Sequence, residues 1–317
     1  MNFQQLRSVR EALRRNFNLT EVANTLYTSQ PGVSRQIREL EDELGTAIFE
    51  RAGKRLTGLT EPGKEIVRII DRLLLEQENL KRAAQEFSIR DQGKLTIATT
   101  HTQARYALPV VVQAFRRQFP HVHLHLQQGS PQHIAEWVAS GQADIGIATE
   151  GLAQDARLVT FPGYRWSHVI VVPPGHALLD SAQPTLADLA RHPIITYEAG
   201  LTGRPHIDDA FAGAGIAPDI VLTAMDADVI KTYVIAGLGV GIIAAMAYDS
   251  DEDAKLRSMP ADHLFASNMT RVAVRRGSYL RNFAMSFIEM FAPHLDRKTV
   301  MTRQEDGTAA IREPEAA

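Results

Sequence analysis

Residues 18–45 read NLTEVANTLYTSQPGVSRQIRELEDELG and divide into two helical patterns separated by a short turn. In the second pattern, apolar residues recur at spacings of four, three and four, which places them on one helix face: Val33, Ile37, Leu40 and Leu44. Thr20 is a favourable N-cap for the first helix, and Thr28 or Ser29 for the second. Pro31 falls in the first turn of the second helix, and Gly45 is a typical stop signal. The stretch therefore predicts two short helices joined by a tight turn.

The polar residues of the second helix lie off its apolar face, near the helix start and along its outer side. A recognition helix enters the major groove of DNA with its N-terminal residues toward the base edges, where Gln pairs with adenine and Arg with guanine. The next segment, FERAGKRLTGLT (49–60), holds basic residues around a glycine and predicts a hairpin, or wing, that contacts phosphates. The alternative is a plain helical pair with a solvated charged face, but the basic hairpin favours DNA binding. The candidate DNA-binding residues are Ser29, Gln30, Pro31, Ser34, Arg35, Arg38, Arg51, Lys54 and Arg55.

Residues 61–87, EPGKEIVRIIDRLLLEQENLKRAAQEF, predict one long helix with Thr60 as its cap. Its apolar residues follow a four–three alternation broken once by Gln77, namely Ile66, Ile70, Leu73, Leu80, Ala84 and Phe87. Such a seam requires a partner helix. We therefore expect a DNA-binding domain at 1–59 and a linker helix at 60–89 that pairs two copies, so that two half-sites are read at a fixed spacing. The alternative is that this helix packs on its own domain.

The composition excludes several classes of protein. The 317 residues carry a net charge of −3 and contain no cysteine, which rules out disulfides and thiolate metal sites. No run of apolar residues approaches membrane-spanning length, and the start, MNFQQLRSVREALRR, lacks a signal-peptide pattern, so we expect a soluble cytoplasmic protein. The alternating row of His121, His123 and His125 is interpreted as a solvated strand face rather than a metal site. No nucleophile turn is present, so neither a cofactor nor an enzymatic activity is expected.

Residues 90–298 alternate strand and helix patterns, which predicts an α/β domain with mainly parallel sheets. The predicted strands are 94–100, 121–128, 143–149, 167–174, 193–198, 241–247 and 270–276. The predicted helices are 102–120, 131–142, 185–192, 206–215, 227–239 and 279–295. The last strand is expected to return to the first of two lobes, at about 93–162 and 267–298, with the second lobe at about 163–266. Residues 299–317 lack periodic apolar residues and predict a disordered tail.

The stretch TTHTQARYALP (99–109) follows the first strand of this domain and contains many neutral hydrogen-bonding groups but no carboxylate. Thr100, Thr102 and Gln103 lie where a strand leads into a helix N-terminus, which favours an anion. Thr149 ends another strand at the expected crossing between the lobes, and Thr202 precedes a helix of the second lobe. Hydrogen-bond donors without an acceptor favour sulfate, or a metabolite carboxylate, over phosphate. The alternative is that these are strand-end and cap residues. Arg105 is left outside the site, because an ion pair with a neighbour explains it equally well.

Several of these motifs together resemble a known family. FQQLRSVREALRRNFNLTEVANTLYTSQPGVSRQIRELEDELGTAIFER resembles the N-terminal domain of LysR-type transcriptional regulators, and GLTEPGK and TTHTQARYALP resemble the CysB branch. The resemblance implies a winged helix-turn-helix, a linker helix and a two-lobed effector domain like those of periplasmic binding proteins. It also implies a homotetramer that acts with promoter DNA and RNA polymerase.

The same resemblance implies a function in sulfate assimilation and cysteine biosynthesis. It places sulfate at the residues Thr100, Thr102, Gln103, Thr149 and Thr202, and it implies thiosulfate or acetylserine-type effectors. Two alternatives stay open: a related regulator of sulfonate or other sulfur-source use, and, in a different class, a cytoplasmic anion-binding protein.

Overall fold

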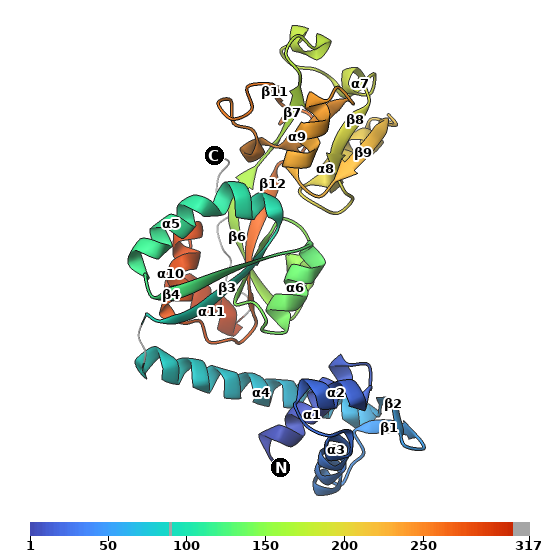
Figure 1. Cartoon of the computed structure of the whole chain (residues 1–317), viewed down its shortest axis with the longest axis vertical. Coiled ribbons are helices and arrows are strands. Elements are labelled where there is room, and N and C mark those ends of the chain that lie inside the picture. Colours follow the sequence, from blue (N-terminus) through green and yellow to red (C-terminus); the bar gives the residue numbers. More distant parts are fainter. Residues whose placement is uncertain (89–90, 307–317) are drawn as a thin grey trace. The chain divides into compact units, whose positions relative to one another are not determined.

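The computed structural model describes residues 1–88 and 91–306 (Figure 1). Contacts divide the chain into two units, Met1–Phe87 and Ser88–Ala317, and each is described by itself. The predicted tail at 307–317 lies outside the described residues.

The first three helices of the N-terminal unit pack their apolar faces together. They are α1 (Phe3–Arg14), α2 (Leu19–Thr25) and α3 (Gln30–Leu44). Val33, Ile37 and Leu40 of α3 are almost completely buried, as predicted, and each contributes about 1.5–3 kcal/mol of burial free energy. Leu44 is exposed instead, because the helix ends there and Gly45 turns the chain away in a left-handed conformation. Ser29 caps α3 as expected, but the cap of α2 is Asn18, so the prediction of Thr20 was wrong.

A two-stranded wing follows α3. Strands β1 (Phe49–Ala52) and β2 (Arg55–Leu59) pair in antiparallel fashion, and Gly53 supplies the positive φ that their tight turn requires. The Glu41 carboxylate of α3 accepts hydrogen bonds from the backbone N–H groups of Ile48 (2.9 Å) and Phe49 (3.1 Å). This acceptor fixes the start of the wing relative to the recognition helix.

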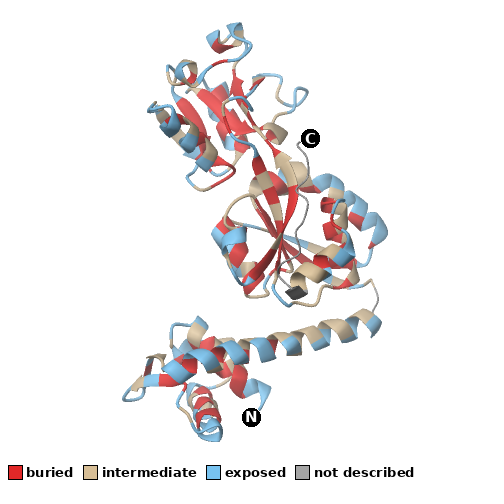
Figure 2. Ribbon diagram, turned by 180° about the vertical axis from the view of Figure 1, so that it is seen from behind, coloured by how far each residue is buried: buried red, intermediate tan, exposed pale blue. Residues whose placement is uncertain are grey.

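The long helix α4 (Glu61–Ser88) contributes buried residues to its own unit over its first half only, and beyond that half Gln77 and Glu78 accept hydrogen bonds from α1. Val67, Ile70 and Leu74 are buried in the core of the N-terminal unit. Beyond Leu74 no described residue of α4 is buried, and Leu80 and Phe87 are 72% and 88% exposed (Figure 2). The predicted seam is therefore divided: Ile70 belongs to the domain core, whereas Leu80 and Phe87 are exposed. No helix in the described part of the chain combines the length and apolar character needed to cross a membrane.

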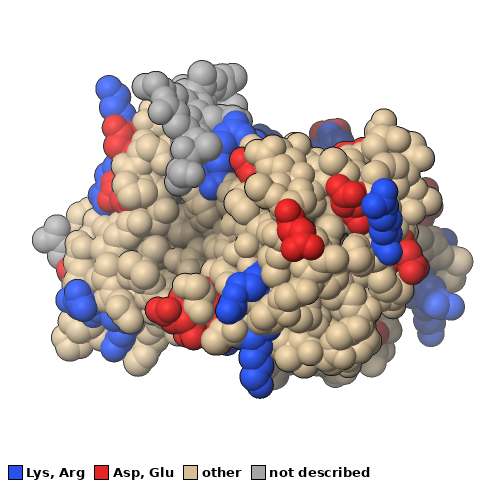
Figure 3. Space-filling model, turned by 90° about the horizontal axis from the view of Figure 1, so that it is seen from above, with Lys and Arg blue, Asp and Glu red and all other residues tan. Residues whose placement is uncertain are grey.

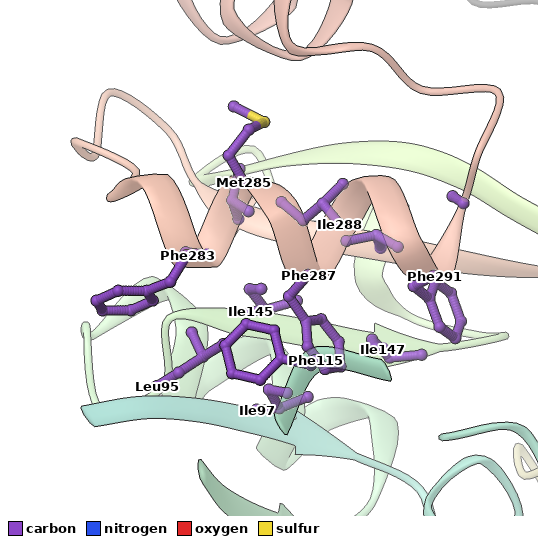
Figure 4. Packing of buried hydrophobic residues seen from close by; sticks show 14 of the residues in the cluster. Leu95, Ile97, Phe115, Ile145, Ile147, Phe283, Met285, Phe287, Ile288 and Phe291 are labelled. Atoms are coloured by element: carbon purple, nitrogen blue, oxygen red, sulfur yellow. The ribbon is translucent and has the colours of Figure 1, made fainter. Parts of the chain in front are cut away.

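The first lobe of the C-terminal unit is a five-stranded sheet in the order β4-β3-β5-β12-β6. Its strands are β3 (Gly93–Thr99), β4 (Val122–Gln128), β5 (Ile145–Ala148), β6 (Leu158–Trp166) and β12 (Asn268–Arg275). Helices α5 (Leu108–Gln118) and α10 (Asn282–Phe291) cover one face, and α6 (Pro131–Ala139) covers the other. Phe283 and Phe287 of α10 point toward apolar residues of the sheet such as Leu95 (Figure 4). This core positions the ends of β3 and β5 rigidly.

The second lobe is a sheet in the order β11-β7-β10-β8-β9. Its strands are β7 (His168–Val172), β8 (Ile194–Tyr197), β9 (Ile220–Ala224), β10 (Val240–Ala244) and β11 (Arg257–Pro260). Helices α7 (Leu186–Leu189) and α8 (Arg204–Gly213) cover one face, and α9 (Ala227–Ile235) covers the other. All seven strands predicted for the C-terminal unit are present, and β6, β9 and β11 are additional.

The connections between the lobes differ from the prediction. Strand β6 pairs with β12 up to Trp166, and β7 begins the second sheet at His168, so the first crossing lies at residue 167 rather than near 162. Thr149 is consequently not at a crossing but at the end of β5 within the first lobe. The returning strand β12 does pair with β5 and β6 of the first lobe, as predicted.

Helix α11 (Arg297–Asp306) lies where the disordered tail was predicted to begin. Val300 is completely buried in the first lobe's core, and this anchoring supplies the burial that the sequence periodicity did not indicate.

Candidate DNA interface and effector site

The predicted DNA-reading residues lie at the start and on the outer side of α3. Ser29, Gln30, Pro31, Arg35 and Arg38 are exposed, and Ser34 is half-buried. Arg35 is 81% exposed and lies 2.6 Å from Glu39 one turn later, a surface pair that is easily exchanged for a phosphate or base. The helix start therefore presents the polar groups that base readout requires.

A hollow of about 680 Å³ lies beside the start of α3. It is lined by Gln30 from α3 and by Lys54 and Arg55 from the wing, so three predicted residues share one surface. The same hollow is lined by Arg14 and Arg15 at the end of α1, which were not among the predicted DNA-binding residues. The adjacent arginines were visible in the sequence, but only the packing of α1 brings them beside the wing. Four basic side chains around one concave surface suit the phosphate backbone of DNA.

Arg51 does not join this basic surface. Its guanidinium lies 2.6 Å from the Glu41 carboxylate, and the two side chains are only 24% and 10% exposed. The ion pair neutralises the charge of Arg51 and holds the first strand of the wing against α3. The structure thus gives Arg51 a role in positioning the wing.

In the C-terminal unit, Thr100 and Thr149 lie at the same edge of the first sheet. Strand β3 runs parallel to β5 and pairs Thr99 with Ile147, so both threonines follow carboxyl ends of neighbouring strands. Ligands of α/β sheets bind at such edges. The antiparallel pairing of β5 with β12 places Thr149 next to Thr270.

A chain of contacts connects this edge to the second lobe. Gln103 Nε2 and Trp166 Nε1 both donate to Thr270 Oγ1, at 3.2 and 3.1 Å. The Trp166 ring packs edge-on against His168, with centroids 5.1 Å apart. His168 Nε2 in turn donates to the backbone carbonyl of Thr202 at 3.2 Å. The network therefore links Gln103 of the first lobe to Thr202 of the second.

Burial sets the protonation state at the centre of this chain. His168 is fully buried, and desolvation lowers the pKa of its imidazole to about 4. The imidazole is therefore neutral near pH 7 and holds its proton on Nε2.

Two almost completely buried side chains at this edge lack hydrogen-bond partners among the described residues. Thr102 and Asn268 are each 1% exposed, yet Thr102 Oγ1 and Asn268 Nδ2 have no partner. Buried polar groups are almost always paired, so such atoms indicate a missing ligand or water. Thr102 also directly precedes a π-helical turn, Gln103–Ala107, and such turns are frequent at functional sites.

The stretch 99–109 contains no carboxylate, but the expectation that the predicted donors lie without an acceptor nearby was wrong. Glu150, directly after Thr149, is turned inward, and its carboxylate accepts a hydrogen bond from the backbone N–H of Gly203 in the second lobe. Burial raises the pKa of this carboxyl. The region thus contains an acceptor as well as donors, so its side chains do not distinguish sulfate from phosphate by donors alone. The sequence showed Glu150, but not the direction of its side chain.

Arg105 forms an ion pair with a neighbour, which was the alternative to a place in the effector site. Its Nε lies 2.9 Å from Asp228, and the neighbouring Tyr106 hydroxyl donates to the same carboxyl group at 2.9 Å. Both contacts join the first lobe to helix α9. Because Asp228 is already neutralised by Arg105, its proximity to His101 and Asp226 does not favour a metal ion.

On the face shown in Figure 3, acidic and basic side chains are interspersed without a broad patch of one sign.

Comparisons with known proteins agree with this geometry. Residues 3–64 match the family described as bacterial regulatory helix-turn-helix protein, lysR family, and residues 89–296 match the LysR substrate binding domain. The chain is 58% identical to the HTH-type transcriptional regulator SsuR of Burkholderia cenocepacia, over 95% of this chain and 97% of that protein. It is 53% identical to CysB of the same organism, over 95% and 96%, and 53% identical to cbl of Escherichia coli, over 92% of each.

Solved structures show the same architecture. The cofactor-binding domain of the Cbl transcriptional regulator is 46% identical and covers 68% of this chain and 94% of its own, with a TM-score of 0.66. Full-length CbnR in complex with its target DNA, at 20% identity, covers 92% of this chain and 99% of its own with a TM-score of 0.56, and shares the fold. The chain belongs to the LysR family of bacterial helix-turn-helix transcriptional regulators, in its CysB-like branch, a family of regulators rather than enzymes.

Proposed function

We propose that this regulator controls genes of sulfate assimilation and cysteine biosynthesis in the cytoplasm, in response to a small anionic effector held between the two lobes. The candidate effectors are sulfate, thiosulfate and acetylserine. The observation that carries the proposal is the pair of buried side chains Thr102 and Asn268, whose Oγ1 and Nδ2 atoms have no hydrogen-bond partner among the described residues. Both side chains lie where the strand ends of the first lobe meet the second lobe. Thr100, Gln103, Thr149 and Thr202 are proposed to complete the site.

The DNA interface is proposed to consist of two surfaces, one that reads bases and one that contacts phosphates. The exposed start of α3, with Gln30, Ser34 and Arg35, reads base edges. The basic hollow, with Lys54 and Arg55, contacts phosphates and fixes the register of the helix.

The open half of α4 supports pairing of two copies. Leu73, Leu80 and Phe87 are 40%, 72% and 88% exposed, and they follow the heptad positions of the seam. A dimer formed through this seam places two recognition helices on two half-sites. We propose that two such dimers form a tetramer and that the complex acts together with RNA polymerase.

Effector control requires two arrangements of the protein with different affinities for the ligand, because a ligand that binds both equally shifts nothing. Contacts such as Arg105–Asp228 and Glu150–Gly203 join the lobes and would differ between the two arrangements. The resulting change in half-site spacing would alter promoter activity.

A second candidate function is regulation of sulfonate or other sulfur-source use. The relatives carry three different names, SsuR, CysB and cbl, at 58%, 53% and 53% identity, so identity alone favours none of them strongly. The candidates differ in effector and in target promoter, and both can be measured.

The experiment that tests the proposal is calorimetric titration of the purified protein with sulfate, thiosulfate, phosphate, O-acetylserine and N-acetylserine. Saturable binding of a sulfur-pathway anion or an acetylserine is expected. Binding of none of them, or of phosphate alone, would refute the effector proposal and leave the family assignment intact. A gel-shift assay with promoter fragments separates a regulator, which shifts DNA, from a pure anion-binding protein, which does not.

A further inference from the structure

The turn before α8 is shaped to hold an anion. Gly200, Thr202 and Gly203 all have positive φ angles, of 78°, 44° and 72°. Turns that combine such conformations direct consecutive backbone N–H groups into one concavity, which attracts anions. Helix α8 begins immediately afterwards, and its N-cap residue, Gly203, provides no side-chain cap. The N–H groups of Arg204 and His206 already donate to the carbonyls of Leu201 and Gly203, and Pro205 has none. The Gly203 N–H and the helix dipole are therefore what favour a negative charge at this point.

A carboxylate of the first lobe already occupies this turn. The Gly203 N–H donates to one oxygen of Glu150, which follows the end of β5. The other oxygen, Oε2, is buried and has no hydrogen-bond partner in the portion of the chain that the structure describes. Burial raises the pKa of the Glu150 carboxyl, so a charge on it is costly. The hydrogen bond is nevertheless a direct contact between the lobes.

An independent donor lies beside the same turn. Asn268, at the start of β12, packs so closely against Gly203 that a β-carbon there would collide with its amide group. Asn268 is 1% exposed, and its Nδ2 is without a partner among the residues described. A buried amide donor and a backbone N–H thus lie at the same turn, and Glu150 accepts a hydrogen bond only from the backbone N–H.

We infer that the Glu150 carboxylate is an internal occupant of the effector site, which competes with the anionic effector for the turn at Gly200–Gly203. The inference rests on the proposed effector function and adds a residue that sets the affinity of that site. A carboxylate and a dianion such as sulfate repel each other in a buried concavity, so the effector binds only when Glu150 leaves the turn or takes up a proton.

The competition also provides a physical link between binding and shape. When the effector replaces Glu150, the Glu150–Gly203 hydrogen bond between the lobes is lost, and the effector's own contacts replace it. The ligand then interacts differently with the two arrangements of the lobes, which is the condition for shifting their equilibrium.

The test is calorimetric titration of the full-length protein and its Glu150→Gln variant with inorganic sulfate. The Gln side chain keeps an oxygen that can accept from Gly203, so only the charge is removed. We expect the variant to bind sulfate at least about tenfold more tightly than the unmodified protein, the effect of removing one like charge from a buried anion site. Glu198→Gln is the matched control, since Glu198 lies between β8 and the turn at Gly200–Gly203, carries the same charge as Glu150 and is exposed. Its sulfate affinity should equal that of the unmodified protein.

The remaining outcomes are distinguishable. Equal or weaker sulfate binding by folded Glu150→Gln would overturn the inference while leaving the effector site standing. Sulfate binding by neither protein would overturn the effector site itself and this inference with it. Thermal unfolding monitors the fold, and Glu150→Ala is a second neutral variant in which tighter binding is expected. Loss of the fold in both variants would show that the carboxylate is required for structure, and would also overturn the inference.

Discussion

Substitutions in the wing should separate the basic residues that contact phosphates from the one that holds the wing in place. Lys54 and Arg55 are exposed and line the basic hollow, whereas Arg51 is neutralised by Glu41 at 2.6 Å. Each phosphate contact contributes about −0.9 to the slope of log affinity against log salt concentration. The double change Lys54→Ala and Arg55→Ala should therefore reduce that slope by about 1.8 for each DNA-bound subunit, or about 3.6 for a dimer on two half-sites.

The slope translates into a measurable change in affinity. Over a fourfold increase in salt, from about 50 to 200 mM, each phosphate contact weakens binding about 3.5-fold. The affinity deficit of the double variant relative to the unmodified protein should therefore shrink about 12-fold per DNA-bound subunit over this range, or about 150-fold for a dimer. Fluorescence anisotropy with a promoter fragment at four or five salt concentrations measures both quantities.

The matched change Arg51→Ala should leave the salt slope unaltered and act on stability instead. It removes the partner of a largely buried carboxylate, which still accepts from two backbone N–H groups. We expect a loss of about 1–3 kcal/mol in the free energy of unfolding of the N-terminal unit, less than for a fully buried pair because Arg51 is partly exposed. A slope reduced by about 0.9 per DNA-bound subunit in Arg51→Ala, or an unaltered slope in the double variant, would refute this division of roles.

Four further results are expected. Gln30→Ala should weaken operator binding by roughly 1–3 kcal/mol without changing the melting temperature, if Gln30 reads a base; unchanged affinity in a gel-shift titration would remove it from the interface. Thr202→Val should weaken sulfate binding by roughly 1–3 kcal/mol in calorimetry, because it removes one donor to a charged ligand, and equal affinity would place the ligand elsewhere. Leu80→Asp should shift the protein toward smaller oligomers in sedimentation velocity, and an unchanged distribution would contradict pairing through α4. Burial lowers the pKa of His168 in the folded protein to about 4, well below the value near 6.5 in the unfolded chain. The folding stability that depends on the neutral imidazole is therefore complete above about pH 6.5 and is lost as the pH falls toward 4. Urea unfolding of the unmodified protein should therefore lose about 3 kcal/mol more than that of His168→Gln between about pH 6.5 and 4, and parallel pH profiles would contradict the assignment.

Most helices and strands of this protein were predictable because they depend on residues close together in the chain, whereas α11 was predicted as part of a disordered tail. The three-to-four spacing in α3, the cap at Ser29 and the stop at Gly45 are local, and they fixed the recognition helix with its exposed polar side. Strand β6, LVTFPGYRW, was missed because glycine and proline interrupt its pattern, and it exists through its long antiparallel pairing with β12. The cap of α2 was misplaced because Asn18 and Thr20 are both good caps, and only the folded turn selects between them.

The sequence by itself determined the order of the elements, the DNA-reading helix, the basic wing and the family, since each follows from short patterns and their spacing. Only the tertiary structure decided which polar and charged side chains pair with other groups of the same chain. Arg51 and Glu41 stand ten residues apart and meet because the wing folds back on α3. Glu150 follows Thr149 directly, yet its partner, Gly203, belongs to the other lobe. Contacts between distant segments depend on how whole layers pack, and the burial that gives these charges and donors their energies does not exist until that packing is complete.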